Sequence, residues 1–201
     1  LEETLATAFP SARIARLDRD VATGRNVDKI LERVRKREVD ILVGTQMVTK
    51  GHDLPHVTLV GAINADAALS IPDFRAAERA FHLLVQVAGR AGRGDKPGRV
   101  LVQTYAPDHP AIELAARHDT KGFVERELVD RKELRYPPFA RLALVRIDDT
   151  DEAAAQDAAA MLADVAREAA KRETELVDVL GPAPAPLPRL RLRYRYRVMV
   201  R

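Results

Sequence analysis

The fold is indicated by the stretch Asp40-Ile41-Leu42-Val43-Gly44-Thr45-Gln46, in which a short apolar run ends in small and polar residues. Such a run predicts a buried strand, as in a parallel sheet. Two further apolar runs follow at Val57–Ile63 and Val100–Val102, with a helix predicted between them at about Phe74–Val87. Strands that alternate with helices in this way predict an α/β fold, with a parallel sheet and flanking helices.

The C-terminal part of the sequence has a different order of elements. Two charged amphipathic helices are predicted over 109–134, and they are followed by a strand at 142–147, an alanine-rich helix at 151–172 and a strand at 176–180. A proline run then leads into a last predicted strand. The order strand, helix, strand, strand indicates an α+β domain that lacks the final helix and strand of a split-βαβ fold. We predict three parts, which are an α/β lobe at 1–107, a helical connector at 108–138 and a truncated C-terminal domain at 139–201.

Composition narrows the possible classes of protein. The 201 residues include no cysteine, which excludes disulfides, thiolate chemistry and cysteine-ligated metal centres. No apolar run approaches the roughly 20 residues that a membrane-spanning helix needs. The N-terminus lacks the features of a signal peptide and reads as the interior of a longer chain. We therefore predict a cytoplasmic protein that does not bind membranes.

Positive charge is concentrated in the tail. The net charge is only +3, but residues 181–201 hold six arginines and no acid. Arginines at alternate positions from Arg189 to Arg197 predict one strand with every arginine on the same face. Five like charges in a row repel one another unless a polyanion screens them, so nucleic-acid contact is the preferred interpretation. A solvated polar face is the alternative.

The loop that follows the first buried strand is a candidate ligand site. Open α/β sheets bind ligands at the carboxyl ends of their strands, where this sequence has Gly44-Thr45-Gln46-Met47-Val48-Thr49-Lys50-Gly51-His52-Asp53. Free backbone N–H groups and the cation of Lys50 could bind a phosphate. The alternative is an ordinary strand-to-loop junction without a ligand, which can have the same sequence pattern. A metal site at His52, Asp53 and His56 is not predicted, because Pro55 breaks the helical face that this spacing requires.

The most specific signal is Gln86-Val87-Ala88-Gly89-Arg90-Ala91-Gly92-Arg93-Gly94. A predicted helix ends here in a glycine-rich turn that carries two arginines three residues apart. Two permanently charged guanidiniums in this position can reach one anion, as an arginine finger does during phosphoryl transfer. Asp95 stands where a P-loop needs lysine, so this is not a Walker A site.

These stretches together resemble the primosomal protein N′ (PriA) family of superfamily 2 replication-restart DNA helicases. The stretch from Asp40 to Asp53 is similar to helicase motif V, and Gln86–Arg93 is similar to motif VI. The resemblance continues through Pro72–Arg79, Arg135–Phe139 and Gly181–Pro184, and it covers essentially the whole chain. It implies the second RecA-like lobe of a helicase, followed by the start of the C-terminal domain.

The resemblance implies roles for particular residues. Arg90 and Arg93 would contact the ATP phosphates across the interlobe cleft, Gln86 would couple that site to the lobe interface, and Gly51 and Asp53 would line the nucleotide. Thr45 and Gln46 would touch the translocated strand or the far edge of the ATP site. Together with Lys50, and with the tail residues Arg189, Arg191, Arg193 and Arg195 that the charge pattern indicates, they form the predicted DNA-binding set. The family unwinds DNA 3′ to 5′ at stalled forks and restarts replication by primosome assembly. The partners implied are forked and single-stranded DNA, single-stranded-DNA-binding protein, primosome proteins and the replicative helicase.

The sequence also departs from the family pattern. Leu54 stands where the family usually has Phe, and His82 stands where Gln is common. Leu192 stands where the family usually has Gly, and a leucine there argues against a close approach of a partner to the backbone of the tail. The family binds zinc, but this chain has no cysteine ligands, and no metal ligand is assigned to it. ATP and Mg²⁺ would be held mainly by a first lobe with the Walker A motif, which is missing here, so the chain alone is not expected to be active.

Three interpretations follow from these observations. The first is a part of an ATP-dependent DNA helicase that carries the arginine-finger lobe. The second is a non-catalytic adapter that holds fork DNA in primosome assembly, which an upstream sequence without a working ATPase lobe would favour. The third is a free-standing nucleotide-binding domain, which would require a phosphate loop with lysine.

Overall fold

The computed structural model describes residues 1–18, 25–45, 54, 56–92, 97–173 and 176–201. The chain divides into two compact units. Unit 1 comprises Leu1–Ser70 and Arg75–Phe123, and unit 2 comprises Ile71–Phe74 and Val124–Arg201. Within the described ranges, no helix is both long and apolar enough to cross a bilayer.

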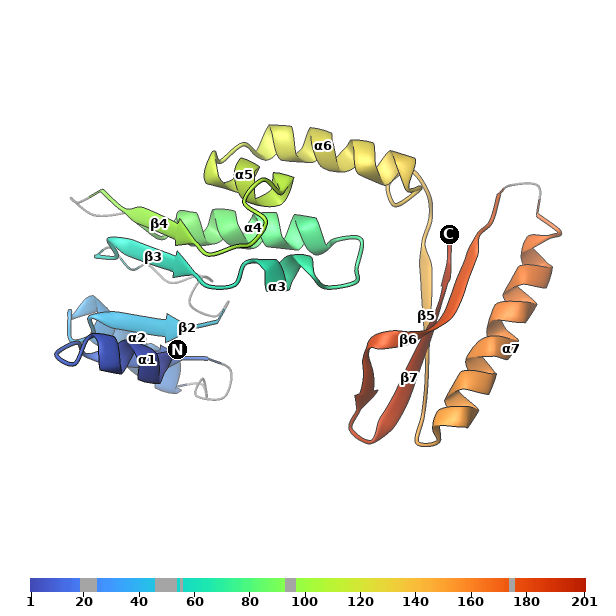
Figure 1. The fold of residues 1–201 in the computed structure, drawn as a ribbon, viewed down its shortest axis with the longest axis horizontal. Coiled ribbons are helices and arrows are strands. Elements are labelled where there is room, and N and C mark those ends of the chain that lie inside the picture. The colour runs from blue at the N-terminus through green and yellow to red at the C-terminus, as the bar shows by residue number, and fades with distance from the viewer. Residues whose placement is uncertain (19–24, 46–53, 55, 93–96, 174–175) are drawn as a thin grey trace. The chain divides into compact units, whose positions relative to one another are not determined.

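Unit 1 is built from helices and short parallel strands (Figure 1). In chain order its elements are α1 (Glu2–Ala8), β1 (Ile14–Leu17), α2 (Arg25–Arg35), β2 (Ile41–Gly44), β3 (Leu59–Ala62), α3 (Asp66–Leu69), α4 (Ala76–Ala88), β4 (Arg99–Val102), α5 (Pro110–Ala116) and the start of α6 (Thr120–Glu133). Strand β1 pairs with β2 and β3 pairs with β4, both in parallel. This confirms the predicted α/β class, with parallel pairing in two two-stranded sheets.

Two hydrophobic clusters stabilise unit 1. In the first, α4 packs against α5, and the ring of Phe81 stacks on that of Phe123 with centroids 4.1 Å apart and planes 3° apart. In the second, Leu17 and Leu31 are buried between β1 and α2, together with Leu54 from the segment before β3. Aliphatic and aromatic side chains buried in this way supply about 1.5–3 kcal/mol each toward folding.

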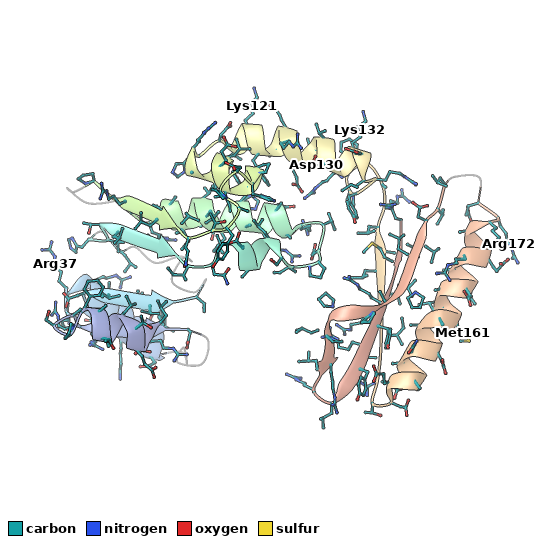
Figure 2. The ribbon with its side chains drawn as sticks, viewed as in Figure 1. Arg37, Lys121, Asp130, Lys132, Met161 and Arg172 are labelled. Carbon is teal, nitrogen blue, oxygen red and sulfur yellow. The ribbon has the colours of Figure 1, made fainter. Side chains whose placement is uncertain are left out.

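Unit 2 is a three-stranded antiparallel sheet covered by one long helix. Its elements are the rest of α6, β5 (Ala143–Asp149), α7 (Glu152–Ala170), β6 (Val179–Leu190) and β7 (Arg193–Val200), with the strand order β5-β7-β6. Ala159 and Ala163 of α7 pack on Val198 of β7, and all three are fully buried. Figure 2 shows Met161 on the opposite side of α7, where its side chain is exposed. The predicted order of elements is confirmed, while the split-βαβ arrangement stays a prediction.

The proline run forms part of β6. This strand contains Pro182, Pro184, Pro186 and Pro188, and it lies at the edge of the sheet. Proline lacks the N–H that a strand donates to its neighbours, so an edge is where a strand tolerates it. The predicted extended conformation of the run is therefore confirmed, and it adds a strand to the sheet.

The predicted single arginine strand is wrong. The chain turns between β6 and β7 at Arg191 and Leu192, which have φ angles of 52° and 63°. Only the arginines of β7, from Arg193 to Arg197, keep the predicted common face, because Arg189 pairs opposite Tyr194 on the other face. Alternation of residue types cannot reveal a two-residue turn, and Arg-Leu is not a typical turn sequence.

A short segment from the middle of the sequence belongs to unit 2. Phe74 stacks on Tyr136 with ring centroids 5.1 Å apart, and the guanidinium of Arg131 lies 5.2 Å from the Phe74 centroid. Arg197 of β7 donates to the carbonyl oxygen of Pro72 at 3.2 Å. These contacts fix the segment Ile71–Phe74 within unit 2.

The start of β1 is joined to the start of β2 by an ion pair. The backbone N–H and the Nε of Arg13 both donate to Oδ2 of Asp40, at 2.8 and 2.9 Å, and Nη2 donates to Oδ1 at 2.8 Å. These hydrogen bonds favour the charged carboxylate and hold the pKa of Asp40 well below its ordinary value of 3.8. The pair therefore stabilises the fold at pH values above that ordinary value, and this stabilisation is lost as the pH falls further.

We expect Asp40→Asn to lower the urea midpoint of unfolding at pH 6, because asparagine is uncharged and offers Arg13 only one acceptor oxygen in place of two. The difference from wild type should narrow between pH 5 and pH 2, because the Asp40 carboxyl takes up a proton in the unfolded wild-type chain over this range, while in the folded chain it stays charged to lower pH. Urea unfolding followed by circular dichroism at several pH values measures this difference. Asp157→Asn is the control, since Asp157 is exposed on α7 and shows no hydrogen bond or ion pair within the described ranges. A difference that stays constant with pH would contradict the prediction.

Candidate functional site

Two of the candidate residues lie in or just after α4. The buried side of this helix carries Phe81, Leu84 and Val87. Gln86 is exposed, and Arg90 follows it after four residues, where the first turn beyond the helix begins. Packing of the apolar side leaves Gln86 on the exposed side of the helix. Arg90 is half-buried and lies in the turn beyond the helix, close to Gln86 along the chain.

The backbone after α4 is closed into a tight loop. The N–H of Gly89 donates to Val85 O at 3.0 Å, and that of Arg90 donates to Val87 O at 3.0 Å. Gly92 then takes a φ of 77°, which favours glycine. A Cβ on Gly92 would lie 2.7 Å from Gly98 N, so the absence of a side chain at Gly92 allows the backbones of these two glycines to approach closely.

One hydrogen bond ties this loop to the segment that follows the other candidate loop. Gly92 N–H donates to Val57 O at 3.1 Å, and Leu54, three residues before Val57, is 4% exposed in the core. Asp53 and Arg93 each directly adjoin one of these residues in the sequence. Sequence reasoning missed Val57 and Gly98, although the Pro97-Gly98 pair is a typical turn signal.

Several candidate residues cannot be assigned a geometry. Thr45 is exposed directly after β2, at the carboxyl end of that strand, as predicted. The candidates that lie outside the described residues are Gln46, Lys50, Gly51, Asp53 and Arg93. Their roles stay predictions.

Charged residues before the motif have structural contacts. Arg75 pairs with Glu78 at 3.5 Å. Asp66 accepts from Thr104 Oγ1 at 2.8 Å and from Tyr105 N–H at 3.1 Å, which lowers the pKa of this carboxyl and ties the start of α3 to the end of β4. These contacts indicate structural roles for Arg75, Glu78 and Asp66.

A metal site is not apparent in the part of the chain that the structure describes. No three histidine or acidic side chains there lie close enough together to hold an ion. His56 Nδ1 lies 3.1 Å from Nη2 of Arg37, while His52 and Asp53 lie outside the described residues.

The four candidate arginines of the tail have different surroundings. Arg193 forms an ion pair with Asp148 and also donates to its carbonyl oxygen at 2.7 Å. The guanidinium of Arg189 lies 5.0 Å from the ring centroid of Tyr194. For Arg191 and Arg195, no hydrogen bond or ion pair is seen within the described ranges. Arg191 is exposed, whereas Arg195 is half-buried.

Comparison with known proteins gives two family matches and many relatives. Residues 1–95 match the helicase conserved C-terminal domain, and residues 132–201 match the primosomal protein N C-terminal domain. The chain is similar to the replication restart protein PriA of Bacillus subtilis, with 44% identity over 91% of the chain, and to that of Synechocystis, with 41% over 90%. The protein of the same name from Treponema pallidum is 44% identical over 79% of the chain. The chain spans only 22–24% of the length of these three relatives.

The two loop glycines predict different responses to substitution. We expect Gly92→Ala to lower the free energy of unfolding by about 1–2 kcal/mol or more, because alanine resists a positive φ and its Cβ meets backbone. Gly89→Ala is the matched control, since Gly89 has a φ of −68° and ordinary contacts, the nearest at 3.5 Å. Urea unfolding measures both variants. Equal losses would show that the loop geometry does not depend on Gly92.

Proposed function

We propose that this chain, which belongs to the PriA family of replication restart proteins, supplies the arginine-bearing lobe and part of the DNA-binding domain of an ATP-dependent 3′–5′ DNA helicase. The observation that carries the proposal is that Gln86 lies on the exposed side of α4, whose other side is buried, and that Arg90 follows in the turn that ends this helix, just before Gly92 with its positive φ. The agreement of the sequence with the family over both units supports it.

The proposed role of the loop is to stabilise charge on ATP. Arg93, with Arg90 beside it, donates to the phosphates from across an interlobe cleft. A guanidinium keeps its charge at any physiological pH and binds phosphate oxygens in a bidentate manner, which stabilises the transition state of phosphoryl transfer. Gln86 couples this event to the surface between the lobes, and Gly51 and Asp53 line the nucleotide.

The remaining proposed components lie on a second lobe or bind DNA. The Walker A lysine and the ligands of Mg²⁺ belong to a first helicase lobe, and the metal neutralises phosphate charge when it is bound there. Thr45, Gln46 and Lys50 contact the translocated strand. The tail arginines contact the phosphates of forked or single-stranded DNA, and single-stranded-DNA-binding protein, primosome proteins and the replicative helicase are the proposed partners.

Replacing the proposed finger should abolish turnover and leave DNA binding intact. In a fusion of this chain to the upstream part of the Bacillus subtilis relative, we expect Arg93→Ala to reduce DNA-stimulated ATPase activity by about 10³-fold or more. Arg90→Ala should reduce it less, since Arg93 is the closer ligand in this proposal. A coupled assay of ADP release, with fork binding followed by fluorescence anisotropy, measures both properties.

Arg99→Ala is the matched control, because Arg99 is an exposed arginine at the start of β4 outside the motif. If Arg93→Ala retains most of the activity, the finger assignment is wrong. If the wild-type fusion binds forks but shows no ATPase activity, the chain serves a non-catalytic adapter, the alternative that the sequence left open.

Removing two tail arginines should reduce the salt dependence of DNA binding. Each phosphate contact adds about 0.9 to the slope of log K against log salt concentration for duplex DNA. We expect Arg191→Ala with Arg195→Ala to flatten this slope by about 1–2, with affinity falling at low salt. Arg141→Ala is the control, since Arg141 is exposed and lies outside the tail. An unchanged slope would identify the tail as a solvated face.

A further inference from the structure

The turn between β6 and β7 exposes an apolar side chain in an unfavourable backbone conformation. Arg191 and Leu192 form a two-residue hairpin turn with both φ angles positive, at 52° and 63°. Turns of this kind favour asparagine and glycine, because other side chains crowd their own backbone when φ is positive. Leu192 is nevertheless present, and it is 74% exposed. Neither turn geometry nor burial explains a leucine here, and such outliers are typical of functional sites.

The surroundings of Leu192 combine apolar and cationic side chains. Leu190, on the other side of the turn, is 48% exposed. The guanidinium of Arg189 lies over the ring of Tyr194, and Arg193 pairs with Asp148. Each of the two strands next to the turn, β6 and β7, therefore carries an arginine with a defined position. No acidic residue occurs between Gly181 and Arg201. The β6–β7 turn therefore places an exposed apolar side chain at the end of a two-stranded, positively charged hairpin.

Nucleic acid is the partner that fits this combination. Arginines on a ribbon contact phosphates, and apolar side chains are the groups that proteins insert between bases. A two-stranded ribbon also has a width that the DNA major groove admits. Base faces are most accessible where a duplex ends in single strands, because the last pair is stacked on one side only.

We propose that Leu192 packs against the last base pair at a junction of single- and double-stranded DNA, while Arg189 and Arg191 contact the neighbouring phosphates. This proposal rests on the DNA binding proposed above for the tail, and it adds the part of the DNA that the hairpin recognises.

The experiment measures binding of the 201-residue chain to a forked DNA with 2-aminopurine at the last paired position. An unbranched duplex with the same probe is the reference. We expect wild type to bind the fork more tightly than the duplex and to raise the probe's fluorescence. Leu192→Gly and Leu192→Asn should weaken fork binding about tenfold and remove the fluorescence rise, with duplex binding unchanged. Leu192→Met should retain both effects.

Two controls separate this contact from a folding defect. Glycine and asparagine suit a positive φ, so neither variant should lower the thermal midpoint of unfolding. Leu187→Asn changes another exposed leucine of β6, at 60% exposure, and should leave fork binding intact.

The outcomes distinguish this proposal from the one on which it rests. If Leu192→Gly retains the fork preference and the fluorescence rise, the junction contact is wrong while DNA binding by the tail stands. A loss of the same size in Leu187→Asn would also overturn the proposal. If the wild-type chain binds neither the fork nor the duplex, both proposals fail. If the Leu192 variants change only the binding of protein partners, the β6–β7 turn contacts protein and the junction proposal is wrong.

Discussion

The stack of Phe81 on Phe123 is the contact on which the arrangement of unit 1 depends. It joins the middle of α4 to the start of α6 and is surrounded by the small side chains of α5. Because the apolar side of α4 is fixed in this way, its polar side must face outward along its full length. The exposure of Gln86 is therefore a consequence of packing.

Unit 2 depends on a different constraint, which is that its most basic strand is also its central one. Strand β7 pairs with β5 on one side and with β6 on the other. Val198 and Tyr196 bury one face of β7 against α7, while the arginines occupy the opposite face. Acidic side chains of unit 2 pair with two arginines of the tail, one in β7 and one directly after it. Asp148 holds Arg193, and Asp178 accepts from Arg201 at 3.0 Å. Sequence charge alone therefore overstates how many tail arginines are available to a polyanion.

The sequence predicts elements well where periodicity is strong. The helix expected at Phe74–Val87 is observed at Ala76–Ala88, because its apolar residues repeat at helical spacing and a glycine ends it. Thr45 could be placed at the end of its strand for the same local reasons. By contrast, the arginine tail alternates so regularly that it reads as one strand, and the turn at Arg191 and Leu192 carries no turn residue. The energetic cost of that turn becomes visible only in the backbone angles.

The sequence by itself determined the classes of structure: an α/β lobe with parallel strands and helices, an α+β C-terminal part that carries the basic tail, and a helix that ends in a glycine–arginine turn. These follow from patterns within a few residues of one another, since periodicity and turn chemistry act locally. The tertiary structure alone decided which distant residues meet. Val57 receives the N–H of Gly92, and Phe74 stacks on Tyr136. Such pairings arise because separate elements bury their apolar faces together, and the partners in that burial are not encoded in the local pattern.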